Sequence, residues 1–288
     1  MNILVTGSNG QLGSEIKDLA LNYKKFNFFF KDLPELDICD IDQLEVFFTQ
    51  NKINTVINCA AYTKVDQAEE DQNQANLINH NAVRELAKIS KKNKIKLIHI
   101  STDFVFNGHK REPYTEDDKT SPINIYGETK LAGELAIIST MPFNSIIIRT
   151  GWVYSEFGNN FVKTILNLAK KNDVLDIISD QFGTPTYAYD LAFLILHIIN
   201  TDKFLQNNKS SEILHYSNEG KSSWYDFAKE IIDISGIDCQ LNPIGARDYP
   251  LAAKRPKYSI LSSKKVSEEY DVSIEHWKDA LKICLKNL

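Results

Sequence analysis

The first 150 residues alternate short, strongly apolar runs with longer segments of helical periodicity, and this alternation constrains the fold more than any other feature. The apolar runs cover residues 2–6, 26–31, 54–59, 95–100 and 145–149. Strands that are covered by helices on both faces read as continuous apolar runs of this kind. The pattern therefore predicts an α/β fold built on a Rossmann-like, doubly wound parallel sheet.

The remaining segments complete the predicted organisation. Helices are expected over residues 10–21, 41–50, 71–92, 124–138, 159–171, 189–199, 222–235 and 274–285, with a further strand at 174–178. The pattern loosens after residue 150, so residues 1–150 are expected to form the main domain and residues 151–288 mostly a smaller C-terminal substrate-binding lobe. Within that second part, residues 174–200 are expected to return to the Rossmann sheet.

Charge and hydropathy narrow the function classes. The chain has 288 residues and carries 33 Lys and Arg against 38 Asp and Glu, so its formal net charge is −5. This mild acidity gives no electrostatic basis for binding nucleic acid or an anionic membrane. The longest apolar run, 191–199, is far shorter than the roughly 18 residues of a membrane-spanning helix, and the opening residues lack the pattern of a signal peptide. We predict a cytoplasmic protein that acts on small molecules.

Three glycines follow the first apolar run in the stretch TGSNGQLG. Gly7, Gly10 and Gly13 come directly after a strand and open a helix. Glycine permits a tight turn there and lets the backbone approach a pyrophosphate, which the helix N-terminus attracts with its free N–H groups. The GxxGxxG spacing differs from the commoner GxGxxG, and an ordinary glycine turn is the alternative. Its place in the chain predicts an NAD(P)-binding domain in residues 1–150.

The residue type at the end of the second apolar run bears on the cofactor. Lys31 and Asp32 lie about 20 residues beyond Gly13, where an acidic side chain contacts the adenosine ribose in dinucleotide-binding folds. A carboxylate there favours NADH, whereas a neighbouring cation tolerates the 2′-phosphate of NADPH. The sequence therefore leaves both NADPH and NADH open, and a solvated turn is the alternative role for Asp32.

A YxxxK pair supplies the candidate acid. Tyr126 and Lys130 are four residues apart and lie on one face of an expected helix. An ammonium beside a phenol lowers the pKa of the phenol, which makes tyrosine a usable general acid. Tyr225 and Lys229 have the same spacing, but only the first pair follows an apolar strand that ends at a threonine, Thr102. We predict that Tyr126 and Lys130 are catalytic and that the second pair belongs to an amphipathic helix.

The candidate residues fall at the carboxyl ends of the apolar runs. In chain order they are Gly7, Asp32, residues 60–63, residues 101–103, and Gly151 with Trp152. Ligands of open α/β sheets bind at this edge. The five segments are therefore expected to meet in one crevice.

Together these segments resemble the extended short-chain dehydrogenase/reductase superfamily, and within it the dTDP-4-dehydrorhamnose reductase family. The likeness covers residues 1–265 and rests on the stretches TGSNGQLG, NCAAYTKVDQAEED, STDFVFNG, EDDKTSPINIYGETKLAGE, IIRTGWVY, DQFGTPTY and RPKYSIL. The resemblance implies reduction of the C4 keto group of dTDP-4-dehydro-L-rhamnose to dTDP-L-rhamnose with NADPH or NADH. Such a product serves polysaccharide biosynthesis.

The resemblance also assigns site residues position by position. The catalytic residues of the family fall on Thr102, Tyr126 and Lys130. With Gly7 added from the glycine turn, the cofactor contacts fall on Gly7, Gly10, Gln11, Leu12, Asp32, Asp37, Ile38, Ala61, Tyr62, Thr63, Tyr126 and Lys130. The sugar-nucleotide contacts fall on Thr102, Asp103 and Trp152, and Arg255 is a candidate diphosphate contact. The alternatives are a contact between lobes for Trp152 and a surface ion pair for Arg255.

Two residues of the stretch STDFVFNG depart from the family pattern. Phe104 and Asn107 stand where the family often has Tyr and Asp. A lost polar contact can shift discrimination between sugars. Another nucleotide-sugar reductase or an epimerase of the same fold stays an alternative, because a threonine, a tyrosine and a lysine recur in such enzymes. A non-catalytic NADP-binding regulatory subunit that resembles the reductase is a further alternative.

The sequence predicts no metal site. No two histidines have the HxH, HxxxH or HExxH spacing of metal ligands, and His99, inside an apolar strand, is interpreted as a core histidine. Some relatives use an acidic residue that matches Glu15 for a metal between subunits, but no matching carboxylate occurs near the end of this chain. We expect a dTDP-sugar as the binding partner and leave a homodimer open.

Overall fold

The computed structural model describes residues 1–206 and 210–288. Six parallel strands form the main sheet in the order β10-β5-β4-β3-β1-β2. These are β1 (Asn2–Thr6), β2 (Asn27–Lys31), β3 (Thr55–Asn58), β4 (Lys96–Thr102), β5 (Ser145–Thr150) and β10 (Glu212–His215). The order reverses between β1 and β3, which creates the switch point of a doubly wound sheet. The predicted α/β fold is confirmed.

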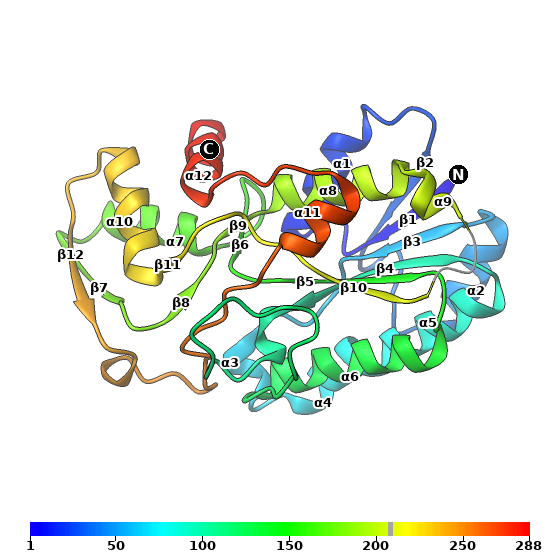
Figure 1. Ribbon diagram of the computed structural model, residues 1–288, viewed down its shortest axis with the longest axis horizontal. Helices are drawn as coiled ribbons and strands as arrows, with labels where there is room; N and C mark the ends of the chain where they lie inside the picture. The colour runs from blue at the N-terminus through cyan, green and yellow to red at the C-terminus, as the bar shows by residue number, and fades with distance from the viewer. Residues whose placement is uncertain (207–209) are drawn as a thin grey trace.

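Helices cover both faces of the main sheet (Figure 1). One face packs against α1 (Gln11–Ala20), α8 (Ala188–Asn200) and α11 (Lys264–Tyr270), and the other against α2 (Ile41–Gln50), α5 (Val83–Lys92) and α6 (Ile125–Thr140). Side chains alternate along each strand, so Ile3 and Val5 face α1 and α8 while Leu4 faces α2 and α5. Because helices cover both faces, the first halves of the strands are mostly apolar.

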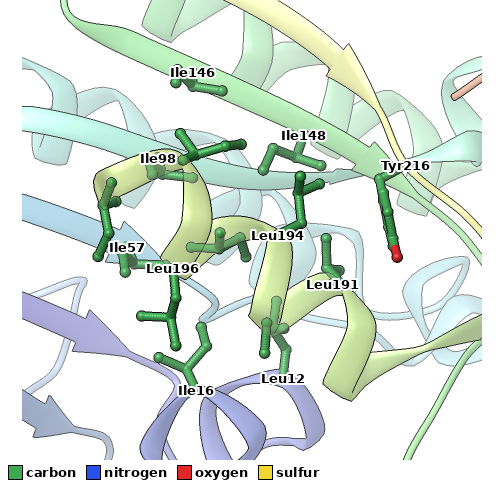
Figure 2. Packing of buried hydrophobic residues seen from close by; sticks show 14 of the residues in the cluster. Leu12, Ile16, Ile57, Ile98, Ile146, Ile148, Leu191, Leu194, Leu196 and Tyr216 are labelled. Atoms are coloured by element: carbon green, nitrogen blue, oxygen red, sulfur yellow. The ribbon is translucent and has the colours of Figure 1, made fainter. Parts of the chain in front are cut away.

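Helix α8 is a core helix rather than a surface helix. Figure 2 shows Leu191, Leu194 and Leu196 between the sheet and Leu12 and Ile16 of α1. Burying one such side chain stabilises the fold by about 1.5–3 kcal/mol, which explains why α8 is almost continuously apolar. In the part of the chain that the structure describes, no helix combines the length and the apolar character that a membrane crossing requires.

The second lobe has its own apolar cluster and small sheets, and lies at the left of Figure 1. Its helices are α7 (Phe161–Ala169), α10 (Trp224–Ser235) and α12 (Trp277–Asn287). Its strands pair as β6 (Val153–Tyr154) with β9 (Thr186–Tyr187), β7 (Val174–Ile178) with β12 (Gln240–Ile244), and β8 (Phe182–Gly183) with β11 (Ser222–Ser223). Phe227 and Trp277 are buried at its centre.

The expectation that residues 174–200 return to the main sheet is wrong for the strand predicted there, β7. Strand β7 pairs with β12 of the second lobe, whereas α8 does pack on the main sheet. The sixth strand of the main sheet is instead β10, which pairs with β5 and which the sequence did not predict. A short apolar run shows that a strand forms but not which sheet it joins, and β10 is disguised by its polar ends, Glu212 and His215.

The segment expected as one helix over residues 71–92 is interrupted. It consists of α4 (Gln72–Asn76), a π-helical turn, η1 (Leu77–Ala82), and α5. The remaining short elements are α3 (Val65–Ala68), α9 (Asp202–Leu205) and the 3₁₀ turns η2 (Asp103–Val105) and η3 (Ala246–Asp248). The π-helical turn places Asn79 against the loop that follows β3, as described below.

Candidate active site

The glycine turn after β1 is shaped for a phosphate group. Gly7 has a left-handed φ of 62°, and a Cβ atom there would lie 2.6 Å from the backbone nitrogen of Ala60, so only glycine fits. A Cβ atom at Gly10 would meet only the Gly7 carbonyl oxygen, at 3.3 Å, which leaves open space against the backbone. Helix α1 starts at Gln11, and the first N–H groups of a helix have no partner within it. The turn therefore fits the pyrophosphate of a dinucleotide.

Asp32 lies beside this turn. It follows β2, and its Oδ2 accepts a hydrogen bond of 3.0 Å from the backbone N–H of Asn9. The neighbouring Lys31 forms an ion pair with Glu35, which lowers the pKa of the Glu35 carboxyl. The carboxylate is thus held next to the glycine turn, while the cation that would favour NADPH is engaged elsewhere.

The other predicted cofactor residues occupy two loops at the same sheet edge. Ile38 is buried. Asp37 Oδ1 accepts a hydrogen bond of 2.8 Å from the backbone N–H of Cys39. Residues 61–63 follow β3, and both backbone polar groups of Tyr62 bind the Asn79 side chain, at 2.9 and 3.0 Å. Asn79 belongs to the π-helical turn, so that interruption fixes the loop after β3.

The three predicted catalytic residues come from two neighbouring elements. Thr102 is the last residue of β4. The Asn124 side chain caps α6 by accepting a hydrogen bond of 2.7 Å from the backbone N–H of Gly127, which places Tyr126 in the first turn and Lys130 in the second. Thr102 lies near enough to the Tyr126 hydroxyl to act on the pKa of that tyrosine. The structure therefore brings the predicted threonine and tyrosine together on the strand edge.

Burial shifts the pKa values of the two ionisable residues in opposite directions. Removal from water raises the pKa of Tyr126 to about 12, although the hydrogen bond with Thr102 opposes this. Burial lowers the pKa of Lys130 to about 8. The nearby Glu134 and Cys59 raise this pKa, but by less than burial lowers it. The expected lowering of the tyrosine pKa is thus wrong for this arrangement, because desolvation outweighs the hydrogen bond with Thr102. Tyr126 is protonated at neutral pH, as a proton donor must be.

Lys130 ends a row of polar side chains that crosses three strands. Thr6, Asn58 and His99 are direct neighbours in the register of β1, β3 and β4, and all three are buried. The Thr6 hydroxyl lies 2.6 Å from Asn58 Oδ1, and Asn58 Nδ2 lies 3.0 Å from His99 Nδ1. His99 Nε2 is 3.4 Å from Lys130 Nζ, which also donates to the Ile100 carbonyl oxygen at 2.6 Å. His99 is a core histidine, as expected, but it also contacts the candidate catalytic lysine.

A second polar row crosses β4, β5 and β10 two residues further along. Ser101, Arg149 and His215 are neighbours in register, and all are buried. Arg149 pairs with Glu134 of α6 at 2.7 Å, and Ser101 donates to the same carboxylate. Since residues four apart share a helix face, Lys130 and Glu134 each meet one of the two rows. The face of α6 toward the sheet is therefore polar from Lys130 to Glu134.

Asp103 and Phe104 directly follow Thr102 in the chain and form the turn η2. Asp103 is buried, and its Oδ1 lies 3.1 Å from the Thr102 hydroxyl. Burial raises the pKa of Asp103 to about 6, with Ser259 and Thr102 opposing the shift by hydrogen bonds. The Phe104 ring meets the Tyr126 ring edge to face, with 5.8 Å between centroids. Phenylalanine thus keeps the packing on Tyr126 at the position where the family often has tyrosine.

Trp152 follows β5 and is held by the second lobe. Its φ of 53° is left-handed, which is unusual for so large a residue. Its indole stacks on that of Trp224, with 3.5 Å between centroids and 3° between planes. The indole of Trp152 thus packs against the apolar cluster of the second lobe, and a role in the sugar site stays a prediction.

Arg255 forms the ion pair that was the alternative to a diphosphate contact. Its Nη1 lies 2.9 Å from Asp66 Oδ1 and also donates to the Ala253 carbonyl oxygen, and the bond with Arg255 lowers the pKa of Asp66. Asp66 belongs to α3 in the main domain, whereas Arg255 belongs to the chain segment after β12. Sequence reasoning missed this partner, because nothing in the spacing of the two residues signals their contact.

Known proteins resemble this chain over its whole length. The family described as "RmlD substrate binding domain" matches residues 1–288. The chain belongs to this family. The resemblance inferred from the motifs is therefore confirmed.

The names of two relatives refer to different sugars. A protein of Aggregatibacter actinomycetemcomitans named dTDP-4-dehydrorhamnose reductase is 38% identical over 97% of both chains. A protein of Streptomyces niveus named dTDP-4-keto-6-deoxy-D-glucose reductase is 34% identical, over 96% of this chain and 94% of its own. The crystal structure of dTDP-4-dehydrorhamnose reductase from Bacillus anthracis in complex with NADP has a TM-score of 0.93 at 35% identity, and the match covers 100% of this chain and 99% of that chain.

Proposed function

We propose that this protein reduces the C4 keto group of dTDP-4-dehydro-L-rhamnose to dTDP-L-rhamnose, with NADPH or NADH as the reductant. The observation that carries the proposal is that Thr102, Tyr126 and Lys130 lie at the same sheet edge as the glycine turn. A keto group at that edge would meet both a proton donor and a bound dinucleotide. Membership in a family of oxidoreductases named for this reaction supports the assignment.

The residues have distinct roles in the proposed reaction. The reduced nicotinamide, when bound, supplies the hydride. The Thr102 hydroxyl donates a hydrogen bond to the keto oxygen, where negative charge develops. Tyr126, whose pKa burial keeps high, is protonated at neutral pH and gives its proton to that oxygen. The Lys130 ammonium then stabilises the phenolate.

The cofactor and the sugar are proposed to bind on either side of these residues. The turn at Gly7 and Gly10 and the start of α1 hold the pyrophosphate, and Asp32 holds the adenosine ribose. Asp103 and Trp152 contact the sugar. NADPH is the first cofactor to test, because a close relative was crystallised with NADP. The position of Asp32 beside the glycine turn is the reason to test NADH as well.

A second candidate substrate is dTDP-4-keto-6-deoxy-D-glucose. Phe104 keeps it open, because this residue packs on Tyr126 without the hydroxyl that the family often has there. A hydroxyl contact to the sugar is worth enough to discriminate between related substrates. A relative named for this second ketone lies within the same range of identity.

The test is to supply each ketone, generated in situ, to the purified protein with NADPH and then with NADH. We expect consumption of reduced cofactor together with formation of dTDP-L-rhamnose, and almost none with Tyr126→Phe. Faster turnover of dTDP-4-keto-6-deoxy-D-glucose would move the assignment to the second candidate. Binding of cofactor without consumption on either ketone would contradict the proposal and favour a regulatory subunit.

A further inference from the structure

Two histidines of the main sheet have matched surroundings but differ in the nature of their partners. His99 and His215 are both fully buried, and each places its Nε2 atom 3.4 Å from a cationic side chain, Lys130 or Arg149. Burial and the adjacent cation lower the pKa of both rings, to about 3 for His215. Both rings are therefore neutral at working pH, and each carries one proton on one of its two nitrogens.

The partners of His215 allow only one tautomer. Its Nδ1 lies 3.0 Å from the Tyr114 carbonyl oxygen, which can only accept a hydrogen bond. Its Nε2 faces Arg149, a guanidinium that can only donate. The proton of the neutral His215 ring is thus fixed on Nδ1.

The partners of His99 allow two arrangements. Asn58 can present either an acceptor oxygen or a donor NH₂ group to Nδ1. Lys130 donates when it is an ammonium, but it can accept a hydrogen bond when it is a neutral amine. With a charged Lys130, the His99 proton must therefore lie on Nδ1 and Asn58 must accept. A neutral Lys130 has a lone pair beside its N–H groups, so the His99 proton can then lie on Nε2. The described contacts fit this arrangement, with Asn58 Nδ2 toward His99 Nδ1 and the Thr6 hydroxyl toward Asn58 Oδ1.

We propose that His99 is a positioning residue for Lys130, and that its ring tautomer follows the charge of Lys130. A charged Lys130 donates to the lone pair of His99 Nε2 and to the Ile100 carbonyl, and so keeps its charge in a site that water does not reach. When Lys130 loses its proton, the row from Thr6 to His99 reverses its donors and acceptors. The catalytic role of Lys130 rests on the proposed function, but the tautomer change does not.

The other groups around Lys130 do not produce this change. Burial raises the pKa of Cys59 to about 12, so its thiol stays protonated through the working range. Tyr126 is protonated for the same reason, with a pKa of about 12. Glu134 is held in its ion pair with Arg149. Lys130 is therefore the group whose charge changes between pH 7 and pH 9.

The first test is ¹⁵N NMR of the histidine rings in the protein without added ligand, from pH 6.5 to 9.5. We expect His99 to change from the Nδ1–H to the Nε2–H tautomer as pH rises, while His215 stays Nδ1–H as an internal reference. The change should be absent in Lys130→Met. A single His99 tautomer across this range, or the same change in Lys130→Met, would overturn the inference, whether or not the protein is active.

The second test uses two amides of different reach. In His99→Gln the amide reaches the position of Nε2 and can accept from Lys130, whereas in His99→Asn it reaches only the position of Nδ1. A hydrogen bond to a charged group is worth about 1.5–3 kcal/mol, which corresponds to a pKa change of about one unit or more. We expect the alkaline fall of kcat/KM in His99→Asn to move to lower pH by about one unit, and His99→Gln to restore it.

The matched control is His215→Gln, in which the altered side chain contacts Arg149 instead of Lys130. We expect it to lose stability without moving the pH profile. Equal profiles for His99→Asn and His99→Gln in folded proteins would overturn the positioning role, and so would a shift of the same size in His215→Gln. If no ketone is reduced by the wild type, the proposed function fails while the NMR result still decides the tautomer change.

Discussion

The chain contains two YxxxK pairs, and the structure places them in opposite surroundings. Tyr126 and Lys130 lie near the start of α6, and Tyr225 and Lys229 near the start of α10. Lys130 is 2% exposed, whereas the side chain of Lys229 is 56% exposed and pairs with Asp233. The same spacing thus gives a buried site in one helix and a solvated face in the other.

The difference lies in what each helix packs against. The face of α6 that carries Lys130 and Glu134 meets polar side chains of β4 and β5, such as His99 and Arg149. Helix α10 buries Phe227 and Ile231 in the apolar cluster of the second lobe, packs Tyr225 against the edge of that cluster and leaves Lys229 in water. The spacing therefore defines a helix face, and the sheet edge that this face meets defines its chemistry.

The largest expected effect separates the two tyrosines. Removing the proton donor with Tyr126→Phe should lower kcat by about 10²–10⁴-fold, the usual contribution of a general acid. Tyr225→Phe should leave kcat unchanged, because this hydroxyl lies outside the site. Steady-state rates of NADPH consumption measure both variants. Equal losses in the two variants would break the comparison.

The acidic residue four positions after each lysine gives the next effect. Glu134→Gln breaks a buried ion pair with Arg149 and leaves that cation uncompensated, so we expect a loss of about 3–5 kcal/mol in the free energy of unfolding. Asp233→Asn removes an exposed partner of Lys229 and should change stability little. Urea unfolding of the two variants measures the contrast, and similar midpoints would show that burial does not distinguish the two helices.

Sequence patterns were sufficient for the elements whose periodicity is strong. Helix α2 occupies residues 41–50 as predicted, and Asp40 caps it by accepting a hydrogen bond of 2.9 Å from the backbone N–H of Gln43. The positions of Thr102 and Tyr126 on one sheet edge were predictable too, because parallel strands end on the same side. These inferences depend only on local period and on the direction of the strands.

Contacts between distant segments were beyond the sequence. His99 reads as one polar residue in an apolar strand, and its contact with Lys130 depends on how α6 lies across β4. The same holds for Arg255, whose partner Asp66 is supplied by the other lobe. Packing of this kind is decided by the complementarity of whole surfaces, which no single spacing encodes.

The third effect concerns pH. Burial lowers the pKa of Lys130 to about 8, and the proposed mechanism needs its charged form. Because a lysine loses its charge as pH rises through its pKa, kcat/KM should be constant below pH 7 and fall about tenfold per unit above the pKa. The profile of Lys229→Met should match the wild type. A profile that stays flat to pH 10 would remove Lys130 from the proposed mechanism.

The smallest effect compares the two helix caps. The Asn124 side chain caps α6 and that of Ser223 caps α10, each through a backbone N–H three residues on. Asn124→Ala and Ser223→Ala should each cost about 0.5–2 kcal/mol in the free energy of unfolding, since each leaves a first-turn N–H without its acceptor. Only Asn124→Ala should also lower kcat, because the first turn that loosens there carries Tyr126. Thermal unfolding and initial rates on the same samples separate the two effects, and a loss of kcat in Ser223→Ala would show that activity follows general stability rather than the placement of α6.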